Sequence, residues 1–155
     1  MHAKLSESKI EEANAQFWEQ MLGVEMRLIA QEAADWMEAS HVTGWCHLSG
    51  VWNGRIEVRM SNGLAWMATS VMLAVPEKSV QESDVVDAVK EIANMIVGTM
   101  GTIKSTLPRP CSMTVPEAVM EAREPGEEES VACSAHFQHE AEQLMVRLLE
   151  RVSST

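Results

Sequence analysis

The sequence predicts a single α/β (α+β) domain in which helices pack on antiparallel strands, and three observations support this prediction. The chain has 155 residues, of which 46% are hydrophobic and 23% charged, as in one ordinary globular domain. Apolar residues occur at every second position between 42 and 60, which is typical of strands. Between 83 and 107 they recur at every third or fourth position, which is typical of an amphipathic helix. We assign residues 1–155 to this one domain and expect 1–7 and 153–155 to be flexible ends.

The first half of the chain predicts two helices and a hairpin. The two alternating runs of the hairpin flank Asn53-Gly54, a dipeptide that favours tight turns between strands. The second helix is apolar nearly all round, which predicts that it is buried on every side, and Pro76 ends it. In chain order we expect a helix, a short strand, a segment that is helix or loop, two hairpin strands and a second helix, over residues 8–22, 24–29, 31–40, 42–48, 55–60 and 61–74.

After the helix over 83–107, the chain predicts further strands. Pro116 interrupts a strand predicted over 112–122. Because proline has no backbone N–H to donate to a ladder, we expect this strand to lie at a sheet edge or to bend there. Alternation predicts another strand over 130–139. The last segment, 142–152, fits a helix by the period of its apolar residues, but it is short enough to be a strand.

Overall charge and cysteine usage exclude several classes of function. A net charge of −11 argues against binding nucleic acid or an anionic membrane through a basic surface. No apolar run approaches the ~20 residues that cross a bilayer, and the N-terminus has no hydrophobic signal region, so we expect a cytoplasmic protein. Cys46, Cys111 and Cys133 have no paired spacing and are expected to be reduced thiols. His136 and His139 fall on opposite faces of a predicted strand, so we expect no metal site.

One side of the helix over 83–107 carries a polar stripe, opposite the apolar side chains and within an arc of roughly 60°. The stripe contains Asp87, Glu91, Asn94 and Gly98. Asp84 is the predicted N-cap of this helix. With Pro116 the stripe fixes the pattern Asp-x3-Glu-x2-Asn-x21-Pro. A second Glu-x-x-Asn, at Glu11 and Asn14, lacks the other positions of the pattern, so we exclude it as a site.

This pattern resembles the signature of the CheC/CheX/FliY family of chemotaxis phosphatases, and the order of elements is similar to the single-motif CheX type over residues 8–150. The resemblance implies a CheX-like domain that pairs as a homodimer, with a final strand over 142–152. It also implies hydrolysis of the aspartyl-phosphate of a CheY-like receiver domain. That receiver would carry the divalent cation, Mg²⁺, so the chain itself would need no cofactor.

The resemblance also implies roles for the residues of the pattern. Asn94 would orient the attacking water, and Glu91 would dock to a lysine of the receiver. Asp87 would contact the partner at the rim or interact only with the helix dipole, and Gly98 would give the partner clearance. Pro116 would support the helix from behind. Two other functions stay open: a non-enzymatic docking or scaffold domain in a signalling or flagellar-motor complex, and an unrelated small-ligand sensor.

Overall fold

The computed structural model describes most of the chain, namely residues 7–30, 40–50, 53–102, 111–121 and 125–152. Within this part, no helix is long and apolar enough to span a membrane. The expected chain ends 1–6 and 153–155 lie outside the described residues, whereas Glu7 already begins the first helix. The segment 31–40, predicted to be helix or loop, also lies outside the described residues, apart from Ser40.

The described strands form one seven-stranded sheet in which every pairing is antiparallel. Its order is β1-β6-β7-β3-β2-β4, and β5 pairs with β2 beside β4. The strands are β1 Arg27–Ile29, β2 His41–Gly50, β3 Gly54–Ser61, β4 Cys111–Met113, β5 Glu117–Val119, β6 Glu129–His139 and β7 Glu142–Arg151. The helices are α1 Glu7–Leu22, α2 Asn62–Leu73, the single turn η2 Glu77–Ser79 and α3 Glu82–Thr102. The predicted fold class is confirmed.

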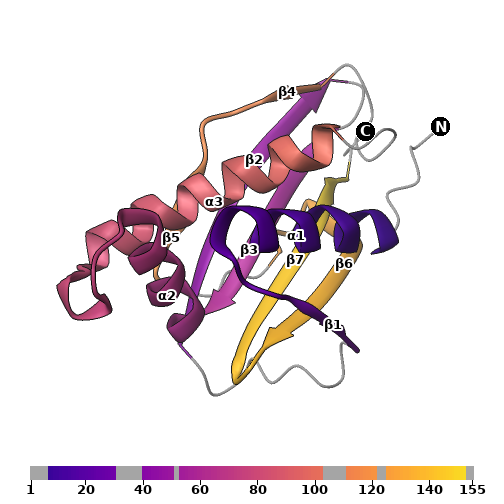
Figure 1. Cartoon of the computed structure of the whole chain (residues 1–155). Helices are drawn as coiled ribbons and strands as arrows, with labels where there is room; N and C mark the ends of the chain where they lie inside the picture. Colours follow the sequence, from indigo (N-terminus) through magenta and orange to yellow (C-terminus); the bar gives the residue numbers. More distant parts are fainter. Residues whose placement is uncertain (1–6, 31–39, 51–52, 103–110, 122–124, 153–155) are drawn as a thin grey trace.

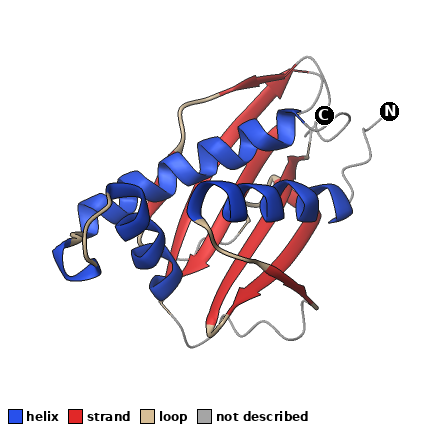
Figure 2. Ribbon diagram, in the orientation of Figure 1, coloured by secondary structure: helices blue, strands red, loops and turns tan. Residues whose placement is uncertain are grey.

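All three α-helices lie across one face of the sheet (Figures 1 and 2). The main core forms between this face and the helices, because the strands turn their alternating apolar residues toward them. α3 contacts β2 and β5, and both α1 and α2 pack beside it. The central helix of the layer is therefore the one that carries the polar stripe.

The final segment is a strand, as the family resemblance implied. Leu144, Val146 and Leu148 pair in register with the core residues of β3. Met145 and Leu149, which gave the segment its helical period, point to the other face of the sheet and are buried there. A strand buried on both faces has no simple alternation, which is why the period alone did not separate strand from helix.

The sheet face away from the helices is rich in buried charge. Glu57 is fully buried and pairs with Arg147 and Arg55, and the Arg55 Nε–Glu129 Oε2 distance is 2.6 Å. Burial alone would raise the pKa of Glu129, but hydrogen bonds from Arg55 and the Gly126 N–H hold it below its usual value. These charges lie between β3, β7 and the start of β6, so they tie the strands together.

The prediction that α2 is buried on every side is wrong. Only Leu64, Ala65, Ala68 and Thr69 are fully covered, while Val71 and Leu73 are about half exposed. α2 packs on β3, β7 and α3 along one side, and an apolar composition cannot show which sides of a helix have neighbours. The helix ends at Leu73, because Ala74 adopts a left-handed conformation with φ of 55°.

Pro116 breaks the edge of the sheet as predicted. β4 and β5 pair with β2 on either side of residues 114–116, and Pro116 itself lies between them. Thr114 takes over part of the ladder, because its N–H donates to the His47 carbonyl and its hydroxyl accepts the His47 N–H. The chain therefore bends at the proline and stays attached to β2.

Candidate functional site

The start of α3 differs from the prediction. The helix begins at Glu82, and Asp84 lies in its first turn instead of capping it from outside. The Asp84 Oδ2 accepts a hydrogen bond of 2.9 Å from the Gln81 N–H, which is half of a capping box. The carboxylate still stabilises the helix start, because it lies beside the positive end of the helix dipole.

The predicted polar stripe is present on the outer side of α3. Asp87, Glu91 and Gly98 are exposed, and Asn94 is half-buried. On the opposite side, the side chains of Val85, Val89, Ile92, Ala93 and Ile96 are all buried. The helix thus presents an acid, a second acid, an amide and a bare backbone position from a rigid support.

The stripe side chains make few contacts within the chain. The Asp87 Oδ1 lies 4.0 Å from the Lys90 Nζ, and the Asp87 side chain is 80% exposed, so this pair contributes little stability. In the part of the chain that the structure describes, no hydrogen bond or ion pair involves the Glu91 or Asn94 side chain. With respect to the described residues, a partner could therefore engage both groups without breaking an internal hydrogen bond or ion pair.

Gly98 has no structural reason to be a glycine. A Cβ added at this position would meet nothing within 4 Å. Glycine inside a helix costs about 1 kcal/mol of stability relative to alanine. Among the described residues, no contact therefore accounts for the glycine.

Pro116 is not part of the stripe. It is half-buried and immediately precedes β5, the strand that contacts α3 beside β2. The structure thus places it in the layer beneath the helix, whereas Glu91 and Asn94 lie on the side that points away from the sheet.

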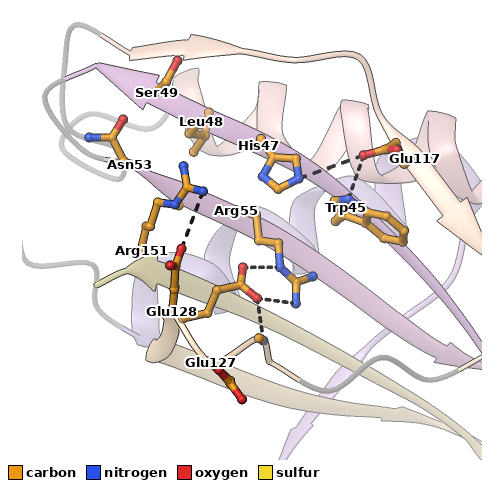
Figure 3. A pocket seen from close by; sticks show the side chains of 13 residues that line it. Trp45, His47, Leu48, Ser49, Asn53, Arg55, Glu117, Glu127, Glu128 and Arg151 are labelled. Carbon is orange, nitrogen blue, oxygen red and sulfur yellow. Dashed lines mark hydrogen bonds and ion pairs between the residues drawn. The ribbon is translucent and has the colours of Figure 1, made fainter. Parts of the chain in front are cut away.

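A hollow of about 800 Å³ lies on the other face of the sheet (Figure 3). Its wall is formed by the β2–β3 hairpin, Glu117 and residues 126–129, and no residue of the stripe lines it. Most of its charged groups pair with one another, as with Arg151 and Glu128 at 3.8 Å and His47 and Glu117 at 4.0 Å. We therefore assign no ligand to it.

The other candidates from the sequence are structural. Asn14 is fully buried and donates to the Ile10 carbonyl at 2.9 Å, so it belongs to the core of α1. Cys46 and Cys133 are free thiols, and burial raises the pKa of Cys46 to about 11, which keeps it protonated and unreactive. Among the described residues, no group of three or more His, Cys, Asp or Glu is placed to hold a metal ion.

Known proteins share the fold and the family of this chain. A family model described as "Chemotaxis phosphatase CheX" matches residues 42–138, which include α3 and Pro116. The chain belongs to the CheX family. Comparison with curated proteins gives no match.

Solved structures of CheX-family proteins share the fold. The chemotaxis protein CheX from Vibrio vulnificus has a TM-score of 0.72 at 20% identity, covering 92% of this chain and 95% of that one. A CheX–CheY–BeF3–Mg²⁺ complex from Borrelia burgdorferi gives 0.68 at 16% identity, covering 94% and 97%. FliY from Thermotoga maritima gives 0.61 at 12% identity, covering 92% and 84%. At such low identity these similarities show the fold.

Gly44 is a further residue near the stripe, and its place was not predicted from the sequence. This residue stands on the core side of β2, directly beneath the turn of α3 that carries Glu91. The available signal was a glycine at an apolar position of an alternating strand, which often marks the close approach of another backbone.

Proposed function

We propose that this CheX-family chain hydrolyses the aspartyl-phosphate of a CheY-like receiver domain. The observation that carries the proposal is the outer side of α3, where Glu91 and Asn94 stand one turn apart without an internal partner among the described residues. A surface helix gains nothing in stability from such a pair. The chain's membership of a phosphatase family supports the assignment of both groups to a partner.

In the proposed reaction, water attacks the phosphorus and the bond from phosphorus to the aspartate oxygen breaks, which releases phosphate and the free carboxylate. The Asn94 amide holds the water, since its oxygen can accept one hydrogen bond while its nitrogen donates another. Phosphoryl transfer depends mainly on positioning and on electrostatic stabilisation. One positioned amide is therefore a sufficient contribution from this chain.

Glu91 docks the helix to the receiver by pairing with a lysine of its active site. The pair becomes stronger as the interface excludes water. The receiver carries the divalent cation, so this chain needs no cofactor of its own. A CheX-family structure from Borrelia burgdorferi is a complex with CheY, which supports a CheY-like partner for this chain.

The remaining residues of the pattern have supporting roles in the proposal. Asp87 contacts the receiver at the rim, where its exposed carboxylate already pairs loosely with Lys90. Gly98 gives the receiver room to approach the helix backbone. Pro116 bends the edge strand so that β5 remains beneath α3.

The test is Asn94→Ala, measured by single-turnover decay of the phosphorylated receiver at saturating protein. The variant should fold and dock normally, because the amide makes no side-chain hydrogen bond with the described residues. The rate should fall on the order of 10²-fold, equivalent to about 2.7 kcal/mol of transition-state stabilisation. Gln20→Ala is the matched control, since it removes an exposed amide from α1. Equal decay with wild type and Asn94→Ala would remove Asn94 from the mechanism and favour the docking or scaffold function.

We also propose that the chain forms a symmetric homodimer through a free sheet edge. β4 is the last strand of the sheet, and pairing there would leave the outer side of α3 open to a receiver. Light scattering at micromolar concentration should give twice the monomer mass of 17.2 kDa. A monomer mass would contradict the proposal.

A further inference from the structure

Gly44 lies where α3 comes nearest to the sheet. A Cβ added to Gly44 would stand 2.8 Å from the Val89 Cγ1, 3.1 Å from the Val89 carbonyl oxygen and 3.5 Å from the Ala93 Cβ. A separation of 2.8 Å is shorter than real Cβ contacts allow, so the Val89 side chain or the helix would have to shift. The 3.1 Å contact with the Val89 carbonyl oxygen would in addition press the helix backbone away from the strand by a few tenths of an ångström. The glycine therefore sets how closely this turn of α3 approaches β2.

Backbone conformation does not explain the glycine. The described glycines with positive φ are Gly23 and Gly50, so Gly44 has a backbone conformation that any residue can adopt. Glycine in the interior of a strand weakens it. The remaining reason is the helix above, and the register agrees, because the neighbour of Gly44 on β5 is Ala118, another small residue.

The turn that rests on Gly44 also carries the proposed site. Val89 and Ala93 face the strand, while Glu91 lies between them in sequence and Asn94 directly follows. Because a helix turn moves as a unit, any displacement of Val89 from β2 also displaces the Glu91 and Asn94 side chains. In a docked receiver, the distance between the Asn94 amide and the phosphoryl group would then change.

We propose that Gly44 is a positioning residue for the phosphatase site, an inference that rests on the proposed function. Gly44 touches neither the receiver nor the water. It acts by letting α3 settle onto β2 at the depth at which Asn94 reaches the phosphoryl group. A misplacement of about 1 Å can cost on the order of 10²-fold in rate, so a shift of a few tenths of an ångström is expected to matter.

The experiment compares Gly44→Ala, Val89→Ala and the double variant. Gly44→Ala should lower the single-turnover rate about 10-fold while the folded protein still docks to the phosphorylated receiver through Glu91. Val89→Ala removes the Cγ1 that would stand closest to the new Cβ. The double variant should therefore recover most of the rate, and Val89→Ala alone should keep it.

A second readout does not depend on activity. The side-chain amide resonances of Asn94, observed by NMR, should shift in Gly44→Ala and return toward their wild-type positions in the double variant. If folded Gly44→Ala keeps the wild-type single-turnover rate and the wild-type Asn94 amide resonances, the inference is overturned. Equal rate losses in Val89→Ala and Gly44→Ala would also overturn it, because general loosening of the core would then be the cause.

The design separates this inference from the proposed function. If wild type is active and Asn94→Ala is not, a neutral Gly44→Ala refutes the positioning role alone. If wild type and Asn94→Ala dephosphorylate the receiver at equal rates, both proposals fail. If Gly44→Ala does not fold, the double variant is compared with Val89→Ala. The new Cβ would still stand 3.1 Å from the Val89 carbonyl oxygen, so recovery is incomplete and the Asn94 amide resonances of these two proteins should still differ slightly; identical resonances would contradict the inference.

Discussion

The two sides of α3 use the same turns for opposite purposes. On the inner side, Val89 and Ile92 are fully buried and hold the helix to the sheet. On the outer side, the side chains of Glu91 and Asn94 have no hydrogen bond or ion pair within the described residues. If the proposed function holds, neighbouring residues in sequence serve either stability or partner binding. Substitutions on the two sides should separate these effects.

The two glycines near this helix show the same contrast. Beneath the helix, a Cβ at Gly44 would stand 2.8 Å from the Val89 Cγ1. On the outer side, a Cβ at Gly98 would meet nothing within 4 Å. The first glycine is required by a contact within the chain, whereas the second has no internal requirement and lowers helix stability. In the proposed function, the open space at Gly98 is the clearance that the receiver uses.

Ile92→Ala tests the inner side and should have the largest effect. Removing a fully buried isoleucine side chain down to alanine should lower the free energy of unfolding by about 2–5 kcal/mol, because lost burial and the remaining cavity add together. Denaturant unfolding measures this loss. The matched control is Glu91→Ala at the adjacent, exposed position, which should leave the free energy of unfolding unchanged. Equal losses in both variants would contradict the division between the two sides.

The same Glu91→Ala variant tests the outer side by a different measurement. If the carboxylate pairs with a receiver lysine, the dissociation constant for the phosphorylated receiver should rise about 10-fold, or ~1.4 kcal/mol. Glu91→Lys should weaken docking further, because two cations would face each other. Titration of the phosphorylated receiver onto each variant gives the affinity. Unchanged affinity in both variants would refute the docking role of Glu91.

Much of the fold was predictable because its signals are local. The hairpin of β2 and β3 follows from alternation and the Asn53-Gly54 turn, and the break in the edge strand follows from Pro116. The exposure of α2 was not predictable, because it depends on which sides of the helix have neighbours. Alternation also does not show that Glu57 is buried, since that depends on what covers the second face of the sheet.

The stripe on α3 was predictable for a similar reason. Helical periodicity places Glu91 and Asn94 on the side away from the core, and the spacing to Pro116 points to the CheX family. The role of Gly44 required the structure. Glycine is needed at this position because Val89, which is distant in sequence and lies on α3, is too close to allow a Cβ. The sequence shows a glycine in a strand but does not show which backbone approaches it.

Gly98→Ala is expected to have the smallest effect, and it tests most directly whether the outer side of α3 serves a partner and not stability. Alanine is the better helix former, and its Cβ would enter open space, so the free energy of unfolding should rise by about 1 kcal/mol. Binding of the phosphorylated receiver should nevertheless weaken, because the methyl group occupies the clearance that the partner uses. Denaturant unfolding and receiver titration on the same protein give the free energy of unfolding and the affinity.

The bulkier Gly98→Gln should weaken binding further while the helix stays folded. A stabilised Gly98→Ala that binds the receiver as well as wild type would show that the glycine provides no clearance, and the receiver would then have to contact α3 nearer its start, around Asp87 and Glu91.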